Sequence, residues 1–235
     1  SRKDPVIYGK RPSGSDTYLN DDQLQFFENN GYLIFESYLF NEEIIKCQEE
    51  LDQLRNDKAA KDNPEYYLEP ASGEVRSIFN IHRTNELFQK LSHDKLILKV
   101  VTQILNSPVY IHQSRINYKP GFEGKEFYWH SDFETWHMED GMPRMRAISC
   151  SITLTDNNEF NGPLMVIPGS HHQYIACVGE TPEDHFKHSL KKQEYGVPDP
   201  KSLQQLADQN GIVSFKGDAG SVIFFDCNIM HGSNG

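Results

Sequence analysis

The pattern of apolar and polar positions along this chain changes near Pro108. Before that residue, the apolar positions recur at helical spacing and predict three helices. The first covers Asp21–Asn30 and ends at Gly31, a residue that readily adopts the left-handed backbone found at helix C-termini. The second begins at Asn41 and the third at Ser92, because both side chains can accept hydrogen bonds from the free N–H groups of a first turn. The first hundred residues are therefore predicted to be mainly helical.

The second and third helices each carry an apolar stripe that would face the core. The stripes consist of Ile44, Ile45, Leu51 and Leu54 in the second helix, and of Leu96, Val100, Val101, Ile104 and Leu105 in the third. Residues 32–35 form a short apolar run that predicts a strand. Residues 1–18 and 57–73 are polar and predict an arm and a loop.

After Pro108 the apolar residues alternate with polar ones, which is typical of half-buried strands. Residues 147–155 place apolar side chains at even positions and small or hydroxylic side chains at odd positions. In residues 109–119 the polar face consists of Gln113, Arg115, Asn117 and Lys119. With the apolar runs at 164–167 and 221–226, this pattern predicts a mainly β fold with flanking α-helices, built as an antiparallel sandwich or barrel.

The polar face of residues 109–119 lies either in solvent or against a water-filled cavity, because burial in an apolar core would carry a large desolvation cost. The neighbouring hydroxylic face favours the cavity, since small side chains leave room for a ligand. Residues 176–210 are mostly polar and predict either a disordered segment or a lid.

Charge and composition narrow the classes of partner. A formal net charge of −11 argues against nucleic acid and against an anionic membrane surface, which both bind clustered Lys and Arg. No apolar run approaches the roughly 20 residues that span a bilayer, and residues 1–10 lack the apolar core of a signal peptide. The four cysteines form no CxxC pair. We therefore expect a cytoplasmic enzyme with free thiols.

His130 and Asp132 stand two residues apart at the end of an aromatic stretch, and His231 follows the apolar run 221–226. On an extended strand, this spacing would point the first two side chains to the same face. Two imidazoles and one carboxylate occupy one face of an octahedral metal and leave three positions open, as in non-haem Fe(II) oxygenases. The ordinary alternative is surface or hydrogen-bonded histidines, as we expect for the other histidines of the chain. A carboxylate at this position favours hydroxylation over halogenation.

At these residues the sequence resembles the phytanoyl-CoA dioxygenase superfamily, whose HxD…H motif lies on a double-stranded β-helix, or cupin-like jelly roll. The segments NGPL at 161–164 and IPGSH at 167–171 also fit this superfamily. The string WHSDFETWH at 129–137, with EDGMP at 139–143 and MRA at 145–147, is narrower and resembles the signature of ectoine hydroxylases. The resemblance covers roughly residue 5 to the end of the chain.

The resemblance implies an Fe(II)- and 2-oxoglutarate-dependent dioxygenase that hydroxylates ectoine to 5-hydroxyectoine and releases succinate and CO2. His130, Asp132 and His231 match the iron ligands. The implied cosubstrate contacts are Lys119, Asn117 and Ser233, and the implied substrate contacts are Gln113, Trp136 and Thr135.

The resemblance also implies an arginine that anchors 2-oxoglutarate about ten residues beyond the second histidine. The sequence ends at Gly235, four residues after His231. We therefore expect a single dioxygenase domain, with a helical part at about 1–107 and a jelly-roll core at about 108–235 whose C-terminal part is missing.

Several alternatives stay open at this point. One is a hydroxylase of another small cyclic amino acid, such as proline. Another is a zinc-dependent hydrolase with Glu134 as its general base, and a third is a non-catalytic metal-containing jelly roll that binds a solute. No oligomeric state follows from the sequence, and a homodimer is one of the possibilities.

Overall fold

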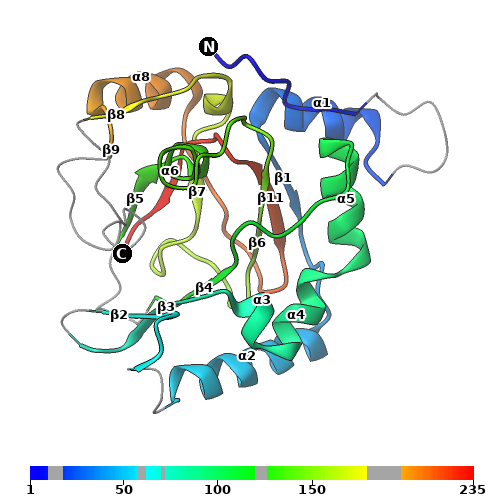
Figure 1. The fold of residues 1–235 in the computed structure, drawn as a ribbon, viewed down its shortest axis with the longest axis vertical. Helices are drawn as coiled ribbons and strands as arrows, with labels where there is room; N and C mark the ends of the chain where they lie inside the picture. The colour runs from blue at the N-terminus through cyan, green and yellow to red at the C-terminus, as the bar shows by residue number, and fades with distance from the viewer. Residues whose placement is uncertain (10–17, 58–61, 70–71, 120–125, 179–196) are drawn as a thin grey trace.

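The strands of the molecule form two main sheets that pack face to face (Figure 1). The computed structural model describes residues 1–9, 18–57, 62–69, 72–119, 126–178 and 197–235. The first sheet has the order β1 (Tyr32–Phe35), β11 (Val222–Asp226) and β6 (Ile148–Ile152). The second has the order β10 (Val213–Ser214), β7 (Met165–Val166), β12 (His231–Ser233) and β5 (Phe127–His130). All these pairings are antiparallel.

The central strand β11 explains how the two sheets and the outer helices share one core. All five of its residues are buried. Val222 and Phe224 point to a cluster formed with the helices, whereas Ile223 and Phe225 pack between the sheets against Val166 of β7. A strand covered on both faces favours apolar side chains at successive positions, which is why residues 222–225 do not alternate with polar residues. The last residue, Asp226, is buried as a charge paired with Arg2.

The remaining strands form two smaller sheets. β2 (Tyr66–Leu68), β3 (Val75–Phe79) and β4 (Arg115–Asn117) form an antiparallel sheet. β8 (Cys177–Val178) pairs with β9 (Val197–Pro198).

The helices cover the outer faces of these sheets (Figure 1). α1 (Asp21–Asn30) and α5 (Lys95–Leu105) pack on the first sheet. α2 (Asn41–Arg55), α3 (Ile81–Thr84) and α4 (Glu86–Ser92) pack on the β2–β3–β4 sheet. α8 (Pro200–Asn210) packs on the outer face of the second sheet. α6 (Asp132–Glu139) follows β5 directly, and the short helix η2 (Ser170–His172) follows β7.

The helix predictions are partly confirmed. α1 has the predicted bounds and ends at Gly31, whose φ of 80° is left-handed. Asn41 is the first helical residue of α2 and not its cap, which is Phe40. Ser92 ends α4, and α5 is instead capped by Asp94, whose carboxylate accepts from the N–H groups of the first turn. Both cap predictions were wrong, because α5 is capped by a different polar residue and α2 by Phe40, which has no side-chain cap hydrogen bond.

Burial and strand length also depart from prediction. Ile45 is 52% exposed, so the predicted core face of α2 is rotated, and Ile44 and Cys47 are its buried residues. The strand predicted at 109–119 is regular only over Arg115–Asn117. The predicted loop 57–73 contains β2, and β3 was missed because buried Arg76 and Ser77 hide it among polar sequence.

The region predicted to be mainly helical also contributes strands to the sheets, since β1 pairs with β11 and β3 pairs with β4. Much of the predicted lid, 179–196, lies outside the described residues, as does 10–17 of the predicted arm. Residues 200–210, at the end of the predicted lid, form the helix α8. Among the described residues, no helix has the length and apolar character needed to cross a bilayer.

Candidate metal centre

The two sheet strands β5 and β12 and the helix α6 bring His130, Asp132 and His231 together. His130 is the last residue of β5, His231 is the first of β12, and the two lie opposite each other in the antiparallel register. One ligand atom from each of the three residues lies within 4.8 Å of the others. Asp132 Oδ1 is 3.8 Å from His130 Nε2 and 3.6 Å from His231 Nε2. Three donors at this spacing can bind one metal ion.

Both imidazoles are oriented by the backbone. His130 Nδ1 lies 2.6 Å from the carbonyl oxygen of Tyr128, and His231 Nδ1 lies 3.1 Å from that of Ile229. A carbonyl only accepts, so each Nδ1 carries the proton and each Nε2 keeps its lone pair. Metal-binding histidines are commonly held in this way.

The carboxylate is oriented by a hydroxyl group. Ser149 on β6 donates from Oγ to Asp132 Oδ2 at 2.6 Å. This hydrogen bond occupies one carboxylate oxygen and leaves Oδ1 facing the imidazoles. The helix start is fixed in addition by Phe133, whose N–H donates to the carbonyl oxygen of Cys227 at 2.8 Å. Ser149 belongs to the hydroxylic face predicted for residues 147–155, but its role beside Asp132 was not predicted.

The electrostatics of the three residues suit a metal cation. Burial and the neighbouring His231 lower the pKa of His130 to about 3, so its ring is neutral at pH 7. Burial raises the pKa of Asp132, but the two imidazoles, the guanidinium of Arg115 and the Ser149 hydroxyl together bring it below its ordinary value. The site therefore presents two imidazole nitrogen donors and one carboxylate anion.

The path of the chain between His130 and Asp132 differs from the predicted one. The two residues do not share a strand, because β5 ends at His130 and Ser131 caps α6, its Oγ accepting from the N–H of Glu134. Asp132 is the first helical residue, and the turn from strand to helix swings its carboxylate toward the imidazoles. The expectation of convergence was right for a different geometric reason.

The helical geometry also bears on the hydrolase alternative. Two residues along a helix turn a side chain by about 200°, so Glu134 faces away from Asp132. It is buried and hydrogen-bonded with Cys177. Glu134 is therefore not placed as a general base beside the metal centre.

Two of the three predicted substrate contacts lie next to the metal ligand Asp132 along the chain. Thr135 and Trp136 follow Asp132 by three and four residues on α6, which places them on the same side of the helix. The Trp136 side chain packs with Phe133 and Met145 and is 8% exposed. Gln113 lies outside the regular strands, in the segment that leads into β4.

Two of the three predicted cosubstrate contacts meet directly. Lys119 Nζ donates to Ser233 Oγ at 2.7 Å and to the carbonyl oxygen of Gly162 at 2.8 Å, and it also donates to the carbonyl oxygen of Asn234. Burial and the nearby charge of Arg76 lower the pKa of Lys119 to about 8. Asn117, on β4, accepts a 2.9 Å hydrogen bond from the hydroxyl of Ser77.

Three cations surround the ring of Phe127, which begins β5. The distances from the ring centre are 4.6 Å for Arg76, 5.6 Å for Lys119 and 6.0 Å for Arg115. Arg76 forms a buried 2.7 Å ion pair with Glu69. Arg115 was predicted only as part of a polar face, although its charge acts on both Asp132 and His130. This positive region beside the metal centre suits an anionic ligand.

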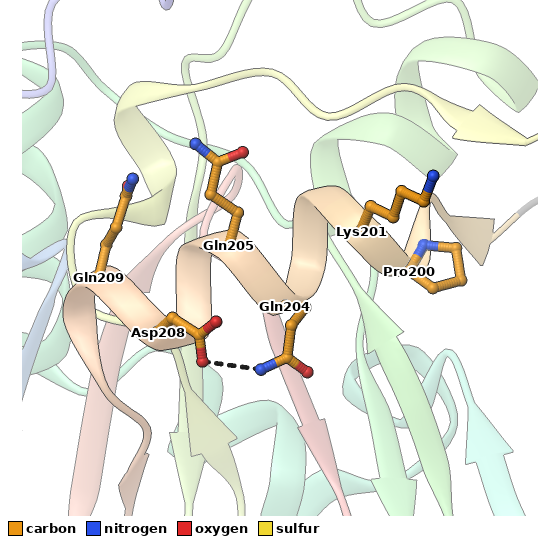
Figure 2. A pocket seen from close by; sticks show the side chains of 6 residues that line it. All are labelled: Pro200, Lys201, Gln204, Gln205, Asp208 and Gln209. Carbon is orange, nitrogen blue, oxygen red and sulfur yellow. Dashed lines mark hydrogen bonds between the residues drawn. The ribbon is translucent and has the colours of Figure 1, made fainter.

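A depression on the surface of α8 has no part in this site (Figure 2). It is lined by Pro200, Lys201, Gln204, Gln205, Asp208 and Gln209. The opposite side of α8, with Leu203 and Leu206, packs against Trp129 and Met230. These two residues immediately precede His130 and His231, whose side chains alternate to the other face of the sheet. The depression is therefore separated from the metal centre by the helix and the sheet.

The donor set fits an iron(II) ion. Two imidazoles and one carboxylate suit Fe(II), and the absence of any cysteine from the set argues against a structural zinc site. Together with two facing antiparallel sheets, this facial set defines the class of the molecule as a non-haem iron oxygenase of the jelly-roll type.

Comparison with known proteins gives the family. The phytanoyl-CoA dioxygenase family model matches residues 27–235, so the chain belongs to this family. The ectoine dioxygenase of Bordetella bronchiseptica is 56% identical over 234 residues, which cover 100% of this chain and 75% of that protein. The chain thus spans about three quarters of the length of this relative.

Solved structures agree. The crystal structure of EctD from S. alaskensis with 2-oxoglutarate and 5-hydroxyectoine has a TM-score of 0.88 and 46% identity, covering 100% of this chain and 76% of the other. EctD from the same organism with bound Fe has a TM-score of 0.87 at the same identity, and again covers 100% of this chain and 76% of the other. These matches confirm the predicted jelly-roll fold with flanking helices.

Proposed function

We propose that this protein is an Fe(II)- and 2-oxoglutarate-dependent dioxygenase that hydroxylates ectoine to 5-hydroxyectoine. The balanced reaction consumes one ectoine, one 2-oxoglutarate and one O2, and yields one 5-hydroxyectoine, one succinate and one CO2. The observation that carries the proposal is the match to ectoine dioxygenases over the whole chain, in a molecule that assembles the facial metal-binding set.

His130, Asp132 and His231 are the proposed iron ligands and form the catalytic centre. Iron(II) bound there, with 2-oxoglutarate, supplies the activation of O2 that the hydroxylation of an unactivated C–H bond requires. The contribution of the chain is to hold these ligands on one face and to keep three coordination positions free. The hydrogen bonds to Tyr128, Ile229 and Ser149 fix the ligand atoms before the metal arrives.

The proposed cosubstrate contacts are Lys119, Asn117 and Ser233. The ammonium group of Lys119, 2.7 Å from the Ser233 hydroxyl, can bind a carboxylate of 2-oxoglutarate in exchange for one of its present carbonyl partners. With a pKa of about 8, Lys119 is mostly protonated at pH 7. The charge of Arg115 beside Phe127 adds to the attraction for a dianion, whereas that of Arg76 is offset by its ion pair with Glu69.

The proposed substrate contacts are Gln113, Trp136 and Thr135. Ectoine carries a carboxylate and a cationic ring, so it needs hydrogen-bonding groups and a surface for the cation. The amide of Gln113 and the hydroxyl of Thr135 provide the first, and the indole of Trp136 provides a face for a cation–π contact. Since a displacement of about 1 Å can lower a rate roughly 100-fold, these residues act chiefly by placing the C–H bond near the metal.

We also propose that the reaction takes place in the cytoplasm and serves compatible-solute biosynthesis under osmotic stress. The four cysteines are unpaired, as expected for a protein in a reducing compartment.

The test is an anaerobic reconstitution of the protein, expressed as its gene encodes it, with Fe(II) and 2-oxoglutarate. O2 is then admitted with and without ectoine, and the products are identified by mass spectrometry. We expect hydroxylated ectoine and succinate in equal amounts. Equal turnover of proline, or succinate formed without any hydroxylated ectoine, would contradict the assignment of substrate. A Trp136→Ala variant is expected to lose ectoine affinity but to keep its iron.

A further inference from the structure

His112 connects two residues that the proposed function places against the substrate. It immediately precedes Gln113 in the chain, and its imidazole lies against the indole of Trp136. The two ring centres are 5.1 Å apart and the ring planes meet at 72°, an edge-to-face arrangement. Edge-to-face pairs of this kind are attractive and directional.

The imidazole is held from its other end by Asp140. His112 Nε2 lies 2.9 Å from Asp140 Oδ2, and because an ionised carboxylate only accepts, Nε2 is the donor. Asp140 is itself fixed at the end of α6, where its N–H donates to the carbonyl oxygen of Trp136 at 3.0 Å. The N–H of Met142 donates to the same carbonyl oxygen at 3.0 Å. Asp140, His112 and Trp136 thus form a closed loop of contacts.

This loop of contacts joins a segment without regular structure to the helix that carries a metal ligand. The segment before β4 is attached at one end by Val109, which packs on the core, and at the other by Ser114, whose carbonyl oxygen accepts from the N–H of Asn80 at 2.9 Å. Between these ends, His112 provides contacts to α6. Gln113 is therefore held between Ser114 on one side and His112 on the other, and of these two His112 is the one in contact with Trp136.

The indole itself has two kinds of support. One side of Trp136 packs in an apolar cluster with Phe133, Met145 and Cys227. These contacts bury the ring but are not directional, whereas the contact with His112 fixes the angle of the ring plane.

We propose that His112, oriented by Asp140, is a positioning residue for the substrate. It holds the indole of Trp136 and the amide of Gln113 in the arrangement that binds ectoine, and it touches neither the metal ligands nor the reacting atoms. Such an arrangement raises affinity because less of the protein has to be ordered when the ligand binds. This inference rests on the proposed function.

The experiment compares three variants with one control. His112→Ala removes the ring contact and the hydrogen bond, His112→Phe keeps a ring, and Asp140→Asn keeps the shape of the carboxylate but removes its charge. His93→Ala is the control, since His93 is an exposed histidine that hydrogen-bonds only near its own helix end. KM, kcat, iron affinity and the ratio of hydroxylated product to succinate are measured for each.

We expect His112→Ala to raise the KM for ectoine about five- to tenfold, as the loss of one directed aromatic contact implies. The product-to-succinate ratio should fall below one, because a misplaced substrate escapes hydroxylation, and iron affinity should not change. Asp140→Asn and His112→Phe should raise KM about two- to fivefold, as is typical of a partly exposed side-chain pair of this kind. His93→Ala should match the wild-type protein.

A purely structural role for His112 predicts another result. Thermal stability would fall in His112→Ala while KM for ectoine and the product-to-succinate ratio stayed at wild-type values, and this outcome would overturn the inference. The ratio is informative because loss of folded protein lowers both products equally.

A separate readout covers the case in which wild-type protein does not hydroxylate ectoine, so that the proposed function itself fails. The chain has two tryptophans, so Trp129→Phe leaves Trp136 as the sole indole reporter. We expect His112→Ala in that background to lower the fluorescence anisotropy of Trp136 at fixed lifetime. Unchanged anisotropy would show that His112 does not hold the ring.

Discussion

Replacing Ser149 by alanine removes a single oxygen atom and is expected to weaken iron binding. The hydroxyl donates to Asp132 Oδ2 at 2.6 Å, and the Asp132 side chain is only 13% exposed. In the metal-bound state the freed Oδ2 would stay buried without this donor. In the metal-free state the carboxylate can turn toward water. Loss of this hydrogen bond therefore destabilises mainly the metal-bound state.

The size of the change in iron affinity follows from the hydrogen bond to Asp132 and from the burial of that carboxylate. A hydrogen bond to a charged group contributes about 1.5–3 kcal/mol, and little of this is lost to solvent at a site so well covered. At about 1.4 kcal/mol per factor of ten, the iron dissociation constant of Ser149→Ala should rise by about 10- to 150-fold. Loss of the residue that orients a metal ligand typically weakens metal binding about 10- to 100-fold, which agrees with this estimate.

The measurement is anaerobic titration of Fe(II) against a competing chelator. Ser151→Ala is the matched control, because Ser151 lies two residues along the same strand and faces the same side. Its iron affinity should equal that of the wild-type protein. An unchanged dissociation constant in Ser149→Ala would refute the argument that the hydroxyl orients the ligand.

Three further predictions concern stability. Arg2→Ala should lower the free energy of unfolding by about 3–5 kcal/mol in urea, because it leaves Asp226 as an unpaired buried charge; a loss below about 1 kcal/mol would contradict the role of the pair. Gly31→Ala should cost more than about 2 kcal/mol, since φ is +80° and the new Cβ would lie 2.5 Å from a histidine nitrogen. Gly73→Ala, with φ +72° and open space, should cost only about 1 kcal/mol. Burial lowers the pKa of Lys119 to about 8 in the folded state, against about 10.4 unfolded. The folded protein therefore binds fewer protons in that window, and its stability should rise between about pH 8 and 10.4 relative to a Lys119→Met variant; parallel pH profiles would exclude this assignment.

Local sequence was sufficient to predict those helices and strands whose boundaries are set by residues close by in the chain. The bounds of α1 follow from its capping box at Asn20 and from Gly31, which are both within one turn of the helix ends. The apolar run of β11 follows from burial on both faces. The approach of His130, Asp132 and His231 was also foreseeable, since the residue types and the strand ends point to a metal centre.

The rest depended on contacts between distant segments. Ser149 meets Asp132 because β6 and β5, the strand that leads into Asp132, belong to different sheets that pack together, and no local period shows that contact. Arg76 is 1% exposed on a strand of otherwise polar appearance, because Glu69 neutralises it there. The turn that makes Asp132 the start of a helix is capped by a serine that strand periodicity alone does not reveal.

Periodicity and residue chemistry therefore specify which groups are present and which face of an element each occupies. Register and packing determine which faces meet. His130 and His231 lie opposite each other because β5 and β12 pair in one register, and a shift of one residue would turn one imidazole to the other face of the sheet, where α8 packs. Such a register is set by side chains across both sheets, so the metal centre is a property of the folded chain as a whole.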